Sequence, residues 1–317
     1  MHTLFFEGEF GQIFPVFTRD GKYNLDYGFS VGRQPLLLQD GLLVNDDKID
    51  LVGFTANALH FPGVPVARIT ALFAWDQIER AHNQTDKDAL LIGLDAAMDL
   101  DLFQSTVEAT ALYVPSNDGG DGFYSGIGAV QRIGRFNTSF RVANSVALEG
   151  NNDRVASGTL LFGEVSFDPR GTHDLVYFNA FWGIDKFSSA DRGPSAGGPL
   201  GRVGILNASV DLGTYGAPLN NYAENAIGAN LGYQKYFGEV PRTQLVVELG
   251  GRMPTKPPTT LQDQPAGGIA ARFQKAFGQR VILSVDAFTV LRENQVPALG
   301  PDWQLSYGGR MEVLVRF

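Results

Sequence analysis

Histidine is scarce among the side chains of this 317-residue chain that could act as a general base. Only His2, His60, His82 and His173 are present, and His82 has a carboxylate, Asp86, four residues away. A histidine that is oriented by a carboxylate can move protons. However, the chain has no cysteine nucleophile and no phosphate-binding loop that would complete a catalytic site. We therefore expect that the protein is not an enzyme.

Three loop segments gather the oxygen-bearing side chains that hard cations such as calcium prefer. They are residues 45–47 (Asn-Asp-Asp), 117–118 (Asn-Asp) and 151–153 (Asn-Asn-Asp). None of them shows the full ligand spacing of a calcium loop. The same residues are favoured in turns, because they cap the backbone and accept left-handed conformations. Turn chemistry is the better interpretation, and we expect neither a metal nor a cofactor.

A larger set of charges falls at every second position of segments whose other face is apolar. In residues 92–101, for example, Asp95 and Asp99 alternate with Leu94 and Met98. Charges of this kind are costly against lipid but are tolerated in a water-filled pore, where they tune its selectivity. The candidate pore-lining residues are Arg68, Asp76, Asp95, Asp99, Glu108, Arg132, Arg141, Glu164, Asp185, Glu248, Arg252, Arg272, Asp286, Arg310 and Glu312.

The elements that carry these charges have a period of two, which is typical of β-strands. Their length suits tilted membrane-spanning strands, whereas no stretch has the ~18 apolar residues of a membrane helix. The net charge of −9 also argues against nucleic acid as a partner. The predicted segments are residues 3–14, 24–35, 48–59, 65–76, 89–100, 104–115, 122–133, 137–148, 157–168, 174–185, 224–236, 242–253, 266–277, 280–291 and 304–316.

The connections between these segments alternate in length, as in bacterial barrels with short periplasmic turns and long outer loops. Counted back from the C-terminus, the alternation indicates that one strand is missing before the first segment. We therefore expect an all-β, antiparallel up-and-down transmembrane barrel of about 16 strands, with a range of 14 to 18, as one domain over residues 1–317. The longest connection covers residues 186–223.

The sequence leaves two points open. Both faces of the segments are similar enough that a soluble β-sandwich, with the aromatic residues in its core, stays an alternative. In addition, Arg33 shares the parity of the apolar Val31, so either a bulge intervenes or this strand is placed out of register.

The C-terminal segment, Tyr307 to Phe317, alternates apolar residues and stops on phenylalanine. It resembles the assembly signal of bacterial outer-membrane porins, with Phe317 as its last residue. The resemblance implies a Gram-negative outer-membrane location, contacts with outer-membrane lipid and the barrel assembly machinery, and a homotrimer. Residues 31–54 also resemble a strand and loop of alginate-export-type porins, which implies a passage for anionic sugars, although Lys and Arg do not dominate the predicted inward positions.

The same resemblance assigns a role to residues 186–223. In porins a long loop commonly folds into the barrel and narrows it, so this loop is a candidate constriction, with Asp191, Arg192 and Arg202 as its charges. A loop that caps the outer mouth is the alternative. For the whole protein, the first hypothesis is passive diffusion of small polar solutes or ions. The second is a non-conducting outer-membrane barrel that acts as a receptor, an anchor or a structural protein.

Overall fold

One large β-sheet dominates the molecule. The computed structural model describes residues 3–14, 26–101, 104–194, 196–208, 217–238, 242–258, 260–296, 298 and 302–315. In spatial order, the strands of the sheet path are β1 (Leu4–Glu9), β2 (Tyr27–Leu38), β3 (Val44–Phe61), β4 (Val64–Asp76), β7 (Leu91–Leu100), β8 (Ser105–Val114), β9 (Gly122–Ile133), β10 (Phe136–Ala147), β11 (Gly158–Phe167), β12 (Leu175–Lys186), β14 (Glu224–Phe237), β15 (Thr243–Pro254), β16 (Ala266–Phe277), β17 (Val281–Glu293) and β18 (Trp303–Val315).

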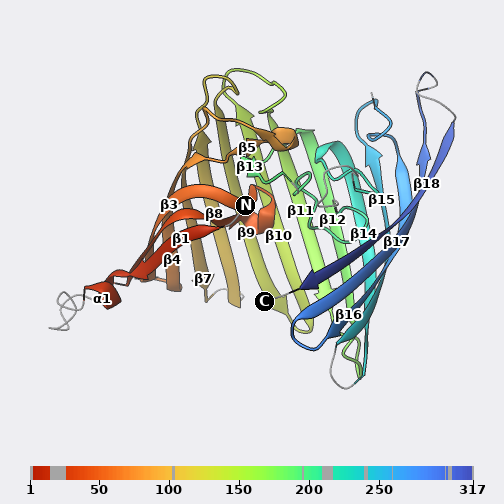
Figure 1. Ribbon diagram of the computed structural model, residues 1–317, viewed down its shortest axis with the longest axis horizontal. Helices are drawn as coiled ribbons and strands as arrows, with labels where there is room; N and C mark the ends of the chain where they lie inside the picture. The colour runs from red at the N-terminus through yellow and green to blue at the C-terminus, as the bar shows by residue number, and fades with distance from the viewer. Residues whose placement is uncertain are drawn as a thin grey trace.

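Every strand of this path pairs antiparallel with the strand that follows it on the path, so the chain runs up and down along a curved wall (Figure 1). A sixteenth strand, β13 (Asp191–Arg192), pairs in parallel with the beginning of β3. The predicted all-β, up-and-down fold of about 16 strands is confirmed. The sixteenth strand comes from the long loop, however, and a further strand before β1 stays a prediction.

The remaining elements are short. They are the helices α1 (Phe10–Ile13), η2 (Gln39–Gly41) and η3 (Ala81–Asn83), and the hairpin of β5 (Glu79–Arg80) and β6 (Gln84–Thr85). Among the described residues, none of the helices has the length and apolar character needed to cross a bilayer.

The wall has one apolar and one mixed face, because successive residues of a strand point to opposite sides. Leu94 of β7 and Ile127 of β9 lie on the outward face and are more than half exposed. Asp95, the neighbour of Leu94, lies on the inward face opposite Thr110 of β8. The described strands form one continuous wall, which differs from the two packed sheets of a β-sandwich, so the sandwich alternative is wrong.

The connections alternate in length as predicted. Tight turns such as residues 134–135 and 278–280 occupy one end of the wall, and Gly134 supplies the positive φ of 61° that such a turn requires. Longer loops occupy the other end, and residues 187–223, between β12 and β14, form the longest of them. Two connections depart from this pattern. The connection between β1 and β2 is long although it belongs to the tight-turn end, and residues 39–43, at the loop end, form a shorter connection than residues 168–174 at the tight-turn end.

The buried apolar core lies inside the curve of the wall, near the end that carries the long loops. It combines wall residues such as Leu112 and Leu160 with loop residues such as Leu42, Leu43 and Leu200, all of them at most 3% exposed. In Figure 1, β5 and β13 are drawn inside this curve. The long loops therefore fold inward and pack on the wall.

Candidate functional site

The loop of residues 187–223 crosses the interior from one side of the wall to the other. Near its start, β13 pairs with Val44 and Asn45 of β3. Further along, Leu206 and Leu219 pack in a cluster with Val246 of β15, as well as with apolar side chains of β16 and β17. The loop thus lies on the inner face of the wall and spans from β3 to β17.

The three predicted constriction charges have different surroundings. Asp191 is fully buried, and its Oδ1 accepts a hydrogen bond from the backbone N–H of Glu79. The Arg192 guanidinium is also buried and donates to the carbonyl oxygens of Gly41, Ala196 and Gly197, so it holds the interior loops together. Arg202 is half exposed, and its Nη2 lies 4.0 Å from a carboxylate oxygen of Asp40.

A polar pocket of about 380 Å³ lies between the inner face of β4 to β10 and residues 35–40, which comprise the end of β2 and the start of η2. Two arginines and three carboxylates contribute to its lining, so charges of both signs face the same space. Its full lining consists of Pro35, Leu36, Leu37, Leu38, Gln39, Asp40, Arg68, Thr70, Leu72, Asp95, Glu108 and Arg141.

Hydrogen bonds fix the wall side of this pocket. Arg141 of β10 donates through Nη1 to Glu108 Oε2 at 2.5 Å and to Gln39 Oε1 at 3.3 Å. Gln39 Nε2 donates in turn to Thr110 Oγ1 at 3.0 Å, and the Thr110 hydroxyl donates to Asp95 Oδ1 at 2.6 Å. This chain of polar groups sets the positions of Arg141, Glu108 and Asp95.

Small residues of β9 let the inner segment approach the wall. A Cβ atom on Gly128 would lie 2.9 Å from Gln39 Oε1, and one on Gly126 would lie 2.7 Å from Gln39 Cγ. A side chain at either position would require Gln39 to move, and at Gly128 also Arg141, whose Nη1 would lie 2.6 Å from the added Cβ. Glycine at these two positions thus leaves the space in which Gln39 and Arg141 meet.

On the opposite part of the wall, several of the predicted pore-lining charges form hydrogen bonds or ion pairs with other groups of the protein. Glu248 is fully buried and accepts hydrogen bonds from the backbone N–H groups of Ile205 and Leu206 and from the Tyr177 hydroxyl. Asp286 binds both Arg272 and Arg310. Arg252 donates to the carbonyl oxygens of Asn220 and Tyr222. These groups position the loop and the strands.

Several other predicted pore-lining residues lie outside the polar pocket. Glu164 lies opposite Asn179 on the inner face of β11, Asp99 accepts from the Thr106 hydroxyl, and Arg132 donates to Gly134 at a tight turn. Asp185 lies at the loop end, where Lys256 binds it at 2.5 Å, and Glu312 is exposed on β18.

The expectation that Asp76 lines the pore is wrong. The pairing of β3 with β4 shifts by one residue between Asp50 and Leu51, and this bulge turns Asp76 to the face of Asp50. Arg33 forms a two-point ion pair with Asp50 and lies 3.7 Å from Asp76. Arg33 keeps the outward parity of Val31, and these carboxylates compensate its charge there.

His82 and Asp86, which the sequence offers as a possible base and its orienter, do not form a pair. His82 Nε2 lies 3.6 Å from Glu224, and Asp86 binds Arg80 and Arg154. Residues 193–197 do match the Gly-x-Ser-x-Gly spacing, but turns follow them where a nucleophile elbow has a helix, and Ser195 lies outside the described residues. Phe317, the predicted assembly signal, lies outside them as well.

Sequence reasoning missed three groups of the interior: Gln39, Arg80 and Tyr124. Arg80 is fully buried and donates to Asp86, to the carbonyl oxygen of Gly120 and to the Tyr124 hydroxyl. A buried arginine in a loop of this kind has no local signal, because its partners come from distant loops and strands. Only the leucines on both sides of Gln39, at residues 36–38 and 42–43, gave a local sign that this segment is buried.

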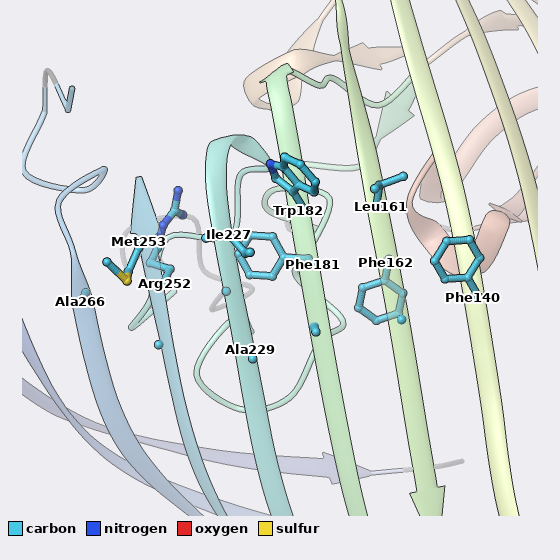
Figure 2. Close-up of a pocket in the computed structure, with 14 residues that line it drawn as sticks. Phe140, Leu161, Phe162, Phe181, Trp182, Ile227, Ala229, Arg252, Met253 and Ala266 are labelled. Carbon is cyan, nitrogen blue, oxygen red and sulfur yellow. The ribbon is translucent and has the colours of Figure 1, made fainter. Parts of the chain in front are cut away.

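A second, apolar hollow of about 780 Å³ is lined by residues of β10 to β16 (Figure 2). Larger side chains such as Phe140, Trp182 and Met253 surround small residues such as Ala180 and Gly251. Phe140, Trp182 and Met253 are between 46% and 63% exposed, so this groove opens on the outward face. With one charged residue in its lining, it offers little to a polar solute.

The comparisons with known proteins support the fold. No family model and no curated protein matches the chain. Among solved structures, it is similar to Pseudomonas aeruginosa OccK11 (OpdR), with a TM-score of 0.55 at 12% identity over 92% of this chain and 78% of that one. Pseudomonas aeruginosa OccK2 (OpdF), solved in complex with glucuronate, gives a TM-score of 0.55 at 10% identity, with 92% and 78% covered.

The chain is also similar to Wzi of Escherichia coli, with a TM-score of 0.57 at 11% identity over 92% of this chain and 68% of that one. Wzi is described as an outer-membrane protein involved in group 1 capsule assembly and as a carbohydrate-binding β-barrel. The chain thus has the fold of outer-membrane β-barrels. These comparisons give no support to the resemblance of residues 31–54 to alginate-export-type porins.

Proposed function

We propose that this protein is a Gram-negative outer-membrane barrel that passes small polar solutes through its lumen, with the polar pocket as a binding site on the way. The proposal combines three features of the chain. They are its apolar outward face, the pocket of mixed charge on its inward face, and a fold shared with outer-membrane barrels at low sequence identity.

The outward face supports a membrane location. Leu249 and Leu305 are 61% and 64% exposed, and aromatic side chains such as Phe140 and Trp182 are about half exposed. A continuous apolar surface of this kind would drive association in water, whereas hydrocarbon solvates it well. The Arg33 charge on this face is neutralised by Asp50, which suits an interface with lipid headgroups.

The observation that carries the channel proposal is the polar pocket. A wall of about 15 strands is too wide for its own side chains to fill, so the interior must hold loops, water or both. On the wall side of the pocket, Arg68 and Arg141 lie among Asp95 and Glu108 on strands β4 to β10. Neighbouring charges of both signs create a local field, which would orient dipolar solutes such as sugars, sugar acids or amino acids.

Single-channel recording in a planar bilayer tests the proposal, with full-length protein refolded in detergent and a salt gradient across the bilayer. We expect discrete current steps, and the sign of the reversal potential reports whether arginines or carboxylates govern the passage. Small hydroxylated or zwitterionic solutes should interrupt the current as they occupy the pocket. Silence from protein that is folded and inserted would exclude the channel.

A second candidate function is a closed barrel that binds carbohydrate without conducting. It is favoured by the fully buried apolar contacts of the interior loops, in which Leu43, Val44 and Leu200 pack at the loop end of the lumen. The similarity to Wzi, a carbohydrate-binding barrel, points the same way. Silent protein that still binds oligosaccharides in a calorimeter would support this function over the channel.

A further inference from the structure

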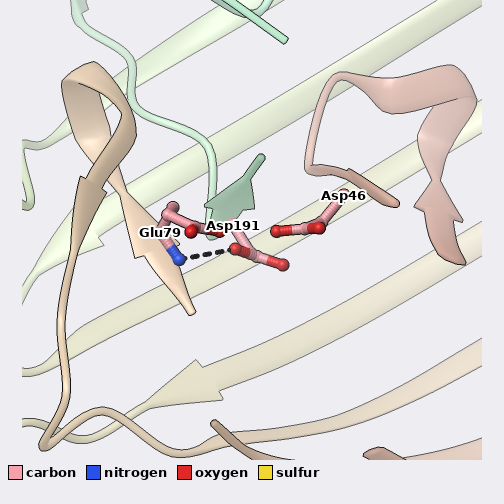
Figure 3. A group of neighbouring side chains, drawn as sticks. All are labelled: Asp46, Glu79 and Asp191. Atoms are coloured by element: carbon pink, nitrogen blue, oxygen red, sulfur yellow. Dashed lines mark hydrogen bonds between the residues drawn. The ribbon is translucent and has the colours of Figure 1, made fainter. Parts of the chain in front are cut away.

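Three buried carboxylates meet between the interior loops (Figure 3). Asp46 comes from the start of β3, Glu79 from the hairpin strand β5, and Asp191 from β13 in the long loop. Their side chains each offer an oxygen, and these oxygens lie within 4.8 Å of one another. All three residues are at most 5% exposed. Segments far apart in the sequence thus bring three acidic groups to one enclosed point.

The hydrogen bonds of the cluster leave two oxygens unused. Asp46 Oδ1 accepts from the backbone N–H of Lys48 at 2.6 Å, and Asp191 Oδ1 accepts from the backbone N–H of Glu79 at 2.8 Å. Asp46 Oδ2 and Asp191 Oδ2 are buried and have no donor among the residues that the structure describes. A buried polar atom without a partner is unfavourable and calls for a ligand.

Among the described residues, no basic side chain forms an ion pair with the cluster, and Lys48 and Arg192 act on it only from a greater distance. Within the described ranges, no Lys or Arg nitrogen lies within 4 Å of the three carboxylates, although Arg192 follows Asp191 directly. The Arg192 guanidinium is engaged by three backbone carbonyls. Three negative charges at this separation, away from water, repel one another strongly unless a proton or a cation joins them.

The pKa values of two of these carboxylates reflect the same burial and repulsion. Burial, together with the neighbouring Asp46 carboxylate, raises the pKa of Glu79 to about 9. Burial and repulsion from Asp46 also raise the pKa of Asp191 well above its usual range.

We propose that Asp46, Glu79 and Asp191 bind a divalent cation, with calcium as the best match. The donors are oxygen atoms only, without histidine or cysteine, and this set suits hard cations. The two unused aspartate oxygens are then direct ligands, and Glu79 supplies the third. This proposal departs from the sequence-based expectation of no metal, and it holds for a conducting or a closed barrel.

Bound calcium would fasten three interior segments to one another. Asp46 anchors the start of β3, just after the loop that borders the polar pocket, while Asp191 anchors the long loop. Glu79 adds the hairpin of β5 and β6. Because each segment contributes one ligand, the cation acts as a cross-link that is absent when calcium is removed, and the interior loops loosen as a result.

Calcium binding by the whole protein in detergent, after exhaustive dialysis against a chelator, is the direct test. Isothermal titration with CaCl₂ should show one ion per chain, with a dissociation constant on the order of 0.1–1 mM or tighter, as in extracellular calcium modules. Calcium should also slow proteolysis within residues 187–223. A wild-type protein that binds no calcium at millimolar concentration overturns the proposal and leaves shared protons as the source of compensation.

Variants locate the site. Asp191→Asn should weaken calcium binding at least about tenfold, because affinity follows the charge of the ligand set. Asp118→Asn is the matched control, since it removes an exposed loop carboxylate outside the cluster and should leave binding unchanged. If Asp191→Asn fails to fold, Glu79→Gln provides the same measurement. Equal calcium binding by a folded cluster variant and the wild type would place the ion elsewhere and overturn the assignment.

Discussion

Glu248 of β15 and Asp286 of β17 form hydrogen bonds and ion pairs within the protein, whereas Asp95 of β7 and Glu108 of β8 face a cavity. Glu248 is satisfied by two loop N–H groups and a tyrosine hydroxyl, and Asp286 by two arginines. Glu108 and Asp95 each have one side-chain partner and still line the polar pocket. Acidic residues therefore hold the loop and the strands together in one half and border a cavity in the other.

The difference arises from the segment that covers each half. Residues 199–208 and 217–219 bring backbone amides and leucines to β15 and β16, so they leave little space. The segment of residues 35–40 brings a glutamine and an aspartate to β7 to β10, and a pocket of about 380 Å³ remains. An inward charge on a wall of this kind is thus not by itself a pore-lining group.

Removal of the Glu248 carboxylate should have the largest effect on this comparison. Glu248→Ala leaves the N–H groups of Ile205 and Leu206 and the Tyr177 hydroxyl without an acceptor, at a cost of about 3 kcal/mol. We expect the loop to detach, which limited proteolysis of the folded protein would detect as new cleavage within residues 196–223. Glu312→Ala, at an exposed inner-face glutamate, is the control. An unchanged cleavage pattern in Glu248→Ala would show that the carboxylate does not hold the loop.

A smaller effect, on selectivity, is expected in the other half. Arg141→Ala leaves Glu108 without its cation, so the reversal potential should shift toward cation preference. Glu108→Gln should shift it the opposite way, each by a severalfold change in the permeability ratio. Arg132→Ala, at the tight-turn end, should change it less than Arg141→Ala. Two shifts of the same sign would mean that the polar pocket does not lie on the conduction path.

The sequence was sufficient for the wall, because the evidence for a strand is local. The alternation of Leu94 and Asp95, or of Leu249 and Glu248, marks both the strand and its two faces within a few residues. The positions of the connections follow from the same pattern. The prediction for Asp76 was wrong, because a one-residue bulge in β4 reverses the face on which the residue after it lies.

The interior could not be predicted in the same way. Gln39 and Arg141 are 102 positions apart, and Asp191 and the Glu79 amide that it binds are 112 apart. No periodicity reports that a loop turns inward, or which wall residues it meets. Residues 45–47 illustrate this limit. Turn chemistry accounts for the hydrogen bond that Asp46 Oδ1 accepts from the backbone N–H of Lys48. The surroundings of Asp46 Oδ2, however, depend on β5 and β13, which are distant in the sequence.

The smallest effect on stability is expected at the exposed rim of the wall, where the long loops lie, outside the two halves compared above. Lys256 and Asp185 form an ion pair at 2.5 Å, but both side chains are about 60% exposed. Water and salt screen such a pair, so Lys256→Ala should change the free energy of unfolding by less than about 0.5 kcal/mol, as measured by urea titration of the refolded protein. Lys256 also lines a mouth pocket of about 460 Å³ with His82, Tyr222 and Glu224. If Lys256→Ala keeps its stability but changes how solutes block the channel current, this rim takes part in solute entry. A large loss of stability would instead contradict the expectation that exposed ion pairs contribute less than inner ones.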